Sequence, residues 1–119
     1  MSVASTVLLD QSLVDEIRRI EQSSGRDGIF ATCVGKLESN LADFRATFVS
    51  CVARGDTLGA VRAAHTLKGS CRQLGAQALG DLFADVERCL KEGDYAQAER
   101  AFDCGAGLVS DSLAALKRA

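Results

Sequence analysis

The amino-acid sequence predicts an all-α protein, and three observations support this prediction. The 119-residue chain has no proline, no tryptophan and one tyrosine, so helix breakers and the aromatic runs typical of strands are scarce. Apolar residues recur at spacings of three and four, which is the helical period. Glycine and aspartate stand at the interruptions, where helices end and begin. At this length we expect one domain with a single core over residues 1–119.

Apolar periodicity and capping residues predict five helices. Asp10 can cap a short first helix that ends in the polar run at residues 23–28, and residues 1–9 are expected to form a flexible tail. The apolar face of this helix comprises Leu13, Val14, Ile17 and Ile20. The later helices are predicted from Ile29 to about Arg54, from about Thr57 to Leu74, from about Gln77 to Leu90 and from about Tyr95 to Lys117, with Asp56 and Asp94 as caps and Gly55 and Gly93 as stops.

The lengths of these helices and of their connections predict the architecture. Four long helices joined by short corners must pack as antiparallel neighbours, which gives an up-down-up-down four-helix bundle over about residues 29–118. The additional short N-terminal helix is expected to lie across one end. Gly105 and Gly107 each weaken the last helix by about 1 kcal/mol relative to alanine, so we expect a kink or close packing there. Each helix has one apolar stripe, which the core requires, so a monomer is expected.

Composition excludes several classes of protein. Apolar residues make up 47% and charged residues 25% of the chain, as in an ordinary globular domain, which argues against disorder. The net charge of −2 provides no global basic field, so we expect no nucleic-acid partner. No apolar run approaches the ~20 residues that span a bilayer, and residues 1–5 lack the basic start of a signal peptide. We therefore expect no membrane insertion and a cytoplasmic location.

The five cysteines are not arranged for metal binding or for a disulfide framework. They lie at positions 33, 51, 71, 89 and 104, with no CxxC pair, and the chain has only one histidine. An odd number of widely spaced cysteines does not suit a disulfide framework. Because there is no CxxC pair and only one histidine, we also predict no metal site. The five are interpreted as small buried hydrophobic residues. Redox sensing by Cys71 is the alternative, suggested only by its position near the motif described below.

The single histidine, His65, is predicted to face solvent from the middle of its helix. The apolar stripe of that helix comprises Ala60, Ala63, Ala64, Leu67, Cys71 and Leu74, and His65 falls on the opposite side. A core or capping histidine is therefore excluded, and an indifferent surface histidine is the remaining structural alternative. The neighbours of His65 on the open face include three cations and a glycine, and the whole set is Leu58, Val61, Arg62, Lys68, Gly69 and Arg72.

These neighbours favour a nucleophilic histidine over a surface histidine without a function. A glycine within a helix costs about 1 kcal/mol relative to alanine, and Gly69 leaves the imidazole uncovered on one side. Nearby cations disfavour imidazolium, hold the ring neutral near about pH 7 and attract a phosphoryl group. Lys68, three residues after His65, is placed to contact that group.

The residues around His65 carry a family resemblance. The segment A-H-T-L-K-G-S at residues 64–70 is followed by Leu74-Gly75-Ala76 and then by Leu79, Leu82 and Glu87. This pattern resembles the histidine-containing phosphotransfer (HPt) domain, whose helix carries an HxLKGS segment and then a short spacer to a glycine at the turn. The match is close over about residues 58–90, and the rest of the chain is similar in the number and length of its helices.

The resemblance implies roles for individual residues. In that family the histidine accepts a phosphoryl group from a receiver-domain aspartate and passes it to another receiver, at the ring nitrogen that faces solvent. By position, His65 resembles the phosphorylated residue, Lys68 the residue that steadies the phosphoryl group, and Gly69 the residue that leaves room for the partner. Gln73 lies where many members have a small polar residue before Leu-Gly, and Glu87 lies on the following helix, where some members have a polar group near the histidine. The expected docking contact is made by Leu58 and Val61 beside Arg62, with Arg72 as a further supporting cation.

The resemblance also implies partners. Receiver domains of response regulators and a sensor or hybrid histidine kinase are expected. The sequence has no P-loop and no glycine-rich nucleotide fingerprint, so we expect no ATP binding, no autokinase activity and no cofactor. The aspartate and Mg²⁺ would belong to the receiver.

Two other readings stay open at this point. A histidine-bearing phosphoacceptor domain of a chemotaxis-type sensor kinase has a similar bundle and receives its phosphoryl group from a kinase domain. A helical adaptor without chemistry is a less favoured alternative. A metal or haem bundle requires inward-facing Glu-x-x-His pairs, and a single outward histidine excludes it.

Overall fold

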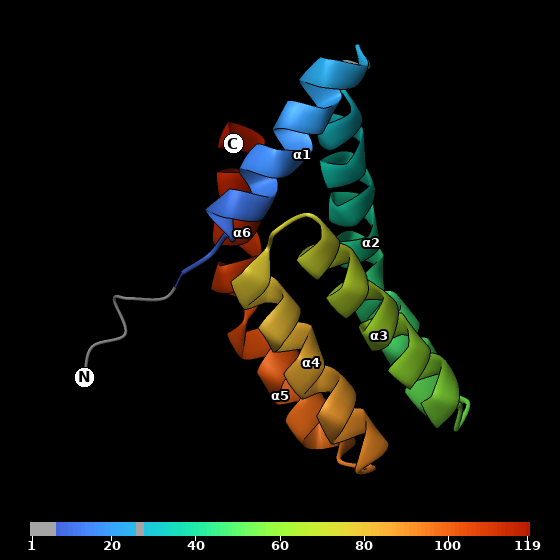
Figure 1. Ribbon diagram of the computed structural model, residues 1–119. Coiled ribbons are helices and arrows are strands. Elements are labelled where there is room, and N and C mark those ends of the chain that lie inside the picture. The colour runs from blue at the N-terminus through green and yellow to red at the C-terminus, as the bar shows by residue number, and fades with distance from the viewer. Residues whose placement is uncertain (1–6, 26–27) are drawn as a thin grey trace, which may run out of the picture.

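The computed structural model describes residues 7–25 and 28–119, and these residues form helices and no strand (Figure 1). The all-α prediction is therefore confirmed for this part of the chain. The helices are α1 (Gln11–Ser24), α2 (Ile29–Ala53), α3 (Thr57–Gln73), α4 (Gln77–Lys91), α5 (Tyr95–Cys104) and α6 (Ala106–Arg118). Residues 1–6 of the expected tail and 26–27 of the expected loop lie outside the described residues. None of the described helices is long and apolar enough to cross a bilayer.

Aspartate side chains cap three helices at the predicted positions. A carboxylate oxygen accepts a hydrogen bond from the backbone N–H three residues later, which satisfies one of the free donors of the first turn. The pairs are Asp10 with Leu13 (3.3 Å), Asp56 with Gly59 (2.9 Å) and Asp94 with Gln97 (3.0 Å). The predicted stops Gly55 and Gly93 have φ values of 70° and 76°, which glycine adopts at little cost.

Helices that follow one another in the chain pack together. α3 contacts α2 on one side and α4 on the other, α4 also contacts α5, and α6 returns to contact α2 and α4. Figure 1 shows α3 and α4 side by side, joined by a short turn, while α1 lies near the C-terminus and packs on α2. α3 is thus supported by neighbours on both sides.

The turn between α3 and α4 is built around Gly75. Its φ of 85° favours glycine, and a Cβ at this position would lie 2.9 Å from Val14 Cγ2 of α1. The segment before α1 is hydrogen-bonded to the same turn, because Asp10 N donates to Gly75 O (2.7 Å) and Ala78 N donates to Leu8 O (3.4 Å). These contacts hold the corner from which α3 and α4 run side by side.

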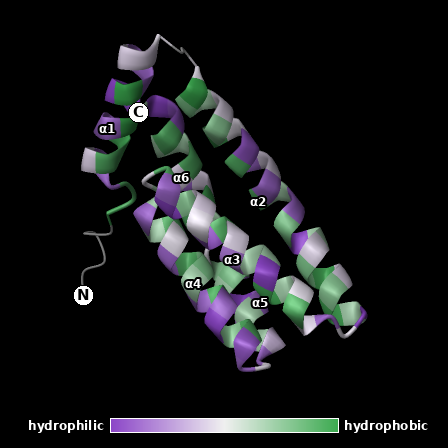
Figure 2. Cartoon of the chain, turned by 45° about the vertical axis from the view of Figure 1, so that its right-hand side comes forward, coloured by the Kyte–Doolittle hydropathy of each residue, from purple (hydrophilic) through white to green (hydrophobic). Residues whose placement is uncertain are grey.

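The core lies mainly between α2, α3 and α4, and α5 packs against it. Phe44 of α2 packs against Phe83 of α4 and Phe102 of α5, with ring centroids 5.2 and 5.0 Å apart. Burial of each such ring contributes about 1.5–3 kcal/mol. Figure 2 shows polar and apolar residues sharing each helix, as helices with one buried face require. α4 supplies four large side chains that are completely buried, which are Leu79, Phe83, Val86 and Leu90.

Two details of the predicted helices are wrong. The last helix is not continuous from Tyr95 to Lys117, because α5 ends before Gly105 and α6 begins after it. A Cβ at Gly105 would lie 2.6 Å from Leu82 Cδ2, so close packing at this glycine is confirmed, whereas Gly107 has open space around it. Ile20, expected on the buried face of α1, is 59% exposed because α1 packs mainly on α2 and buries only a narrow face.

The cysteines do not share one environment. Cys51, Cys71 and Cys89 are buried as predicted, but Cys33 is half-buried and Cys104 is exposed. Cys104 is the last residue of α5, directly before the break at Gly105. Burial raises the pKa of the Cys71 thiol to about 12. A buried thiol that stays protonated is unreactive, which argues against redox sensing by Cys71.

Candidate functional site

His65 projects from the open side of α3. The opposite side of this helix is buried and carries Ala60, Ala64, Leu67 and Cys71, so the predicted orientation of the histidine is confirmed. The His65 side chain is 65% exposed, and its Nδ1 lies 3.1 Å from Oε2 of Glu87 on α4. The imidazole is therefore anchored through one nitrogen while most of the ring faces solvent.

Glu87 connects His65 with two lysines. Its side chain is only 6% exposed, on the side of α4 that faces α3. Lys68 Nζ lies 2.6 Å from Oε1, and Lys91 Nζ lies 3.1 Å from Oε2. We call His65, Lys68, Glu87 and Lys91 the His65–Glu87 cluster.

The electrostatics of the cluster keep Glu87 ionised. Burial alone would raise the pKa of this carboxyl, but hydrogen bonds from Lys68, Lys91 and His65 outweigh burial and lower the pKa to about 2. An ionised carboxylate can only accept hydrogen bonds, so His65 Nδ1 must be the donor. In the neutral ring, Nε2 then carries the free lone pair. The exposed nitrogen of His65 is thus the nucleophilic one.

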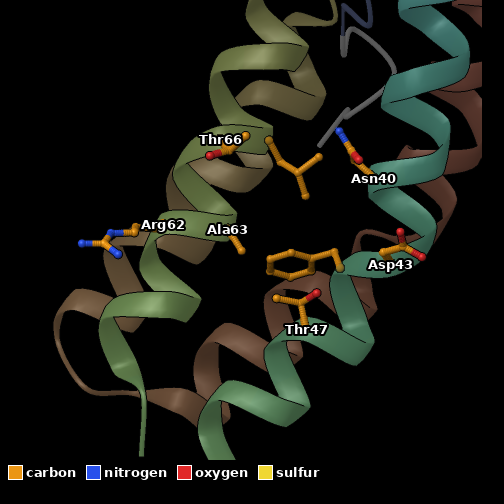
Figure 3. Close-up of a pocket in the computed structure, with 8 residues that line it drawn as sticks. Asn40, Asp43, Thr47, Arg62, Ala63 and Thr66 are labelled. Atoms are coloured by element: carbon orange, nitrogen blue, oxygen red, sulfur yellow. The ribbon is translucent and has the colours of Figure 1, made fainter.

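The environment of His65 differs from the expectation that three cations surround the ring. Arg72 reaches across to α4, where it lies 3.2 Å from Asp81. Arg62 lines a groove between α2 and α3 and extends away from α2 (Figure 3). Of the three cations, only Lys68 contacts a group that also contacts the ring. The charged group hydrogen-bonded to the ring is a carboxylate and not a cation.

Some of the other predicted site residues lie beside the His65–Glu87 cluster, and others lie away from it. Gly69 follows Lys68 on α3, and a Cβ placed on it would have no atom within 4 Å, so the space beside it is open. Gln73 is exposed and lines a depression together with Ile17 of α1 and Cys33 of α2, away from the cluster. Leu58 is 59% exposed, whereas Val61 is partly buried against the core.

Two hollows flank α3. The groove drawn in Figure 3 lies between α2 and α3 and is lined by Asn40, Asp43, Phe44, Thr47, Arg62, Ala63, Thr66 and Leu67. A shallow hollow beside the His65–Glu87 cluster is lined by Lys68, Ala84, Glu87, Arg88, Lys91 and Glu92. The second hollow is lined by three cations, Lys68, Arg88 and Lys91, which pair with the two glutamates of the same hollow.

Sequence reasoning missed Lys91. Its signal in the sequence is weak, because Glu87 and Lys91 form an ordinary pair at i and i+4 on one helix. Only the burial of Glu87 against α3 distinguishes this pair from a surface pair. In the described part of the chain, no group of three or more histidine, cysteine or acidic side chains is placed to hold a metal ion.

One comparison with known proteins gives a match. A family model described as the Hpt domain matches residues 29–119, which begin with α2 and include the whole His65–Glu87 cluster. No curated protein and no solved structure matches the chain.

Proposed function

The chain belongs to the Hpt domain family, and from this premise we propose that it is a phosphorelay intermediate of two-component signalling. His65 accepts a phosphoryl group from a receiver-domain aspartate and passes it to a second receiver. The observation that carries the proposal is an exposed imidazole whose Nδ1 is tied to the buried Glu87 carboxylate. This arrangement leaves Nε2 free as the nucleophile.

The transfer step involves His65 and Glu87 of this chain and the phosphorylated aspartate of the donor receiver. The Nε2 lone pair forms an N–P bond, and the P–O bond to the aspartate breaks with its electron pair remaining on the carboxylate. The proton on Nδ1 stays in place, so the phosphorylated ring carries a positive charge. Glu87 stabilises this charge as it develops, and reverse attack by another receiver aspartate restores the neutral ring.

Lys68 and Gly69 assist the transfer in different ways. Lys68 lies one turn after His65 and exchanges its contact with Glu87 for a contact with the phosphoryl oxygens. The open space at Gly69 admits the receiver's active site. Leu58 supplies an exposed apolar contact two turns before His65, flanked by Val61 and Arg62.

We also propose the arrangement of the helices, the location of the protein and its upstream partner. α2, α3, α4 and the α5–α6 pair form an antiparallel up-down-up-down bundle, with α1 across one end. The protein acts as a cytoplasmic monomer without a cofactor or ATP site of its own, and the receiver supplies Mg²⁺ with its aspartate. A histidine kinase stands upstream in the relay.

Transfer assays with two kinds of donor test the proposal. The protein is incubated with a panel of phosphorylated receiver domains and, separately, with a histidine-kinase catalytic core and ATP. We expect transfer from receivers to give an acid-labile, alkali-stable phosphate that is absent in His65→Gln. Phosphorylation by the kinase core alone would instead indicate the phosphoacceptor domain of a chemotaxis-type kinase. No transfer from either donor would favour a helical adaptor.

A further inference from the structure

Lys91 occupies a distinct place in the His65–Glu87 cluster. Oε2 of Glu87 accepts from both His65 Nδ1 and Lys91 Nζ, each at 3.1 Å, whereas Oε1 contacts only Lys68 at 2.6 Å. Lys91 and His65 thus share one carboxylate oxygen of Glu87, and Lys68 contacts the other. Lys68 can therefore leave Glu87 without disturbing the oxygen that orients the ring.

When Lys68 leaves Glu87, Lys91 stays beside the carboxylate and can keep it ionised. In the proposed function, Lys68 moves to the phosphoryl group, and the carboxylate loses its closest cation. Glu87 is 6% exposed, and a buried carboxylate that loses one of its cations is more readily protonated. A protonated Glu87 would no longer stabilise the positive ring of phosphorylated His65. Lys91 remains within 3.1 Å and supplies the missing charge.

We propose that Lys91 is a positioning residue of the phosphoacceptor site, which keeps Glu87 ionised and bound to His65 Nδ1 while Lys68 contacts the phosphoryl group. This role rests on the proposed function. Within the described residues, the charged or titratable groups that contact Glu87 are His65 and Lys68 from α3 and Lys91 from α4.

A nearby arginine provides a matched control. Arg88 lines the same hollow as Lys91, but its guanidinium pairs with Asp85 at 3.1 Å and Glu92 at 3.6 Å. These partners are exposed, and such surface pairs contribute little to stability. Removing Arg88 therefore subtracts a cation from the hollow without removing one from Glu87.

The experiment is a double-variant cycle on the unphosphorylated protein. Lys68→Ala reproduces the state in which Lys68 has left Glu87. The ionisation constant of Glu87 is measured by carboxyl ¹³C NMR in the parent, Lys68→Ala, Lys91→Ala and the double variant, and ¹⁵N shifts report the proton on His65 Nδ1. Lys91→Ala alone should lower the ionisation constant by a smaller factor, because Lys68 still contacts the other carboxylate oxygen. In the Lys68→Ala background, it should lower that constant about tenfold or more and weaken the Nδ1 bond.

Two further variants separate a specific role from a general effect of charge. In the Lys68→Ala background, Lys91→Arg should leave the ionisation constant of Glu87 at the value of the Lys68→Ala variant, and so should Arg88→Ala. The proposal is wrong if Lys91→Ala has equal effects in both backgrounds or if Arg88→Ala has the same effect as Lys91→Ala. Because this cycle needs no phosphoryl donor, its outcome is separate from that of the transfer assays.

A lifetime measurement connects this role to the phosphorylated state. Phosphoramidate is used to phosphorylate His65 without a protein donor. Phosphohistidine should then decay several-fold faster in Lys91→Ala than in the parent, with Lys91→Arg restoring the parent lifetime. An unchanged lifetime would contradict the role of Lys91. Modification of His65 by phosphoramidate without transfer from any donor protein would contradict only the proposed function.

Discussion

Replacing Glu87 by glutamine is expected to destabilise the fold in a pH-dependent way. The pKa of Glu87 falls from 4.5 to about 2 in the folded protein, because the hydrogen bonds that it accepts from two lysines and His65 outweigh its burial. Each unit of pKa corresponds to about 1.4 kcal/mol, so the ionised carboxylate stabilises the fold by up to about 3 kcal/mol. Since the folded pKa is the lower one, this stabilisation is fully present above about pH 5 and is lost as the pH falls towards 2.

Urea unfolding at a series of pH values measures this contribution. Near about pH 7, Glu87→Gln should lower the free energy of unfolding by about 2–3 kcal/mol, and the difference from the parent should shrink steadily between about pH 5 and 2. Glu92→Gln is the control, because Glu92 is an exposed glutamate of the same helix, paired with Arg88 at 3.6 Å. A difference for Glu87→Gln that stays constant across this range, or that matches the control, would refute the electrostatic role.

Three further substitutions or modifications have defined outcomes. Lys68→Ala should slow phosphoryl transfer or shorten the phosphohistidine lifetime by about tenfold, since a charge-assisted hydrogen bond contributes about 1.5–3 kcal/mol; an unchanged rate would exclude its role. Gly69→Ala should raise the free energy of unfolding by about 0.5–1 kcal/mol because the added methyl group meets no atom, yet slow transfer from receivers; equal transfer rates would show that partners do not approach there. Iodoacetamide should alkylate exposed Cys104 and spare buried Cys71 in the folded protein, as mass spectrometry can show, and rapid labelling of Cys71 would contradict its burial.

Local signals in the sequence were sufficient for most helix boundaries. The caps Asp10, Asp56 and Asp94 and the stops Gly55 and Gly93 act within one turn of the chain, so their effect does not depend on tertiary packing. The orientation of His65 followed from helical periodicity for the same reason. These predictions required only that each helix bury one face.

Features set by contacts between helices were not predictable in this way. Leu82 of α4 packs where a Cβ on Gly105 would lie, and a single sequence does not show which side chain meets a glycine. The partners of His65 likewise depend on the register between α3 and α4. Helical spacing placed Arg62 and Arg72 near the ring, whereas tertiary packing placed Glu87 against it and directed Arg72 to Asp81.

The most direct test is to determine which atom of the protein carries the phosphoryl group. The ¹⁵N-labelled protein is phosphorylated by a receiver domain, and ³¹P–¹⁵N couplings identify the modified nitrogen. We predict a single phosphoryl group on Nε2 of His65, with the proton retained on Nδ1 beside Glu87. A phosphoryl group on Nδ1 or on another residue would contradict the proposed chemistry.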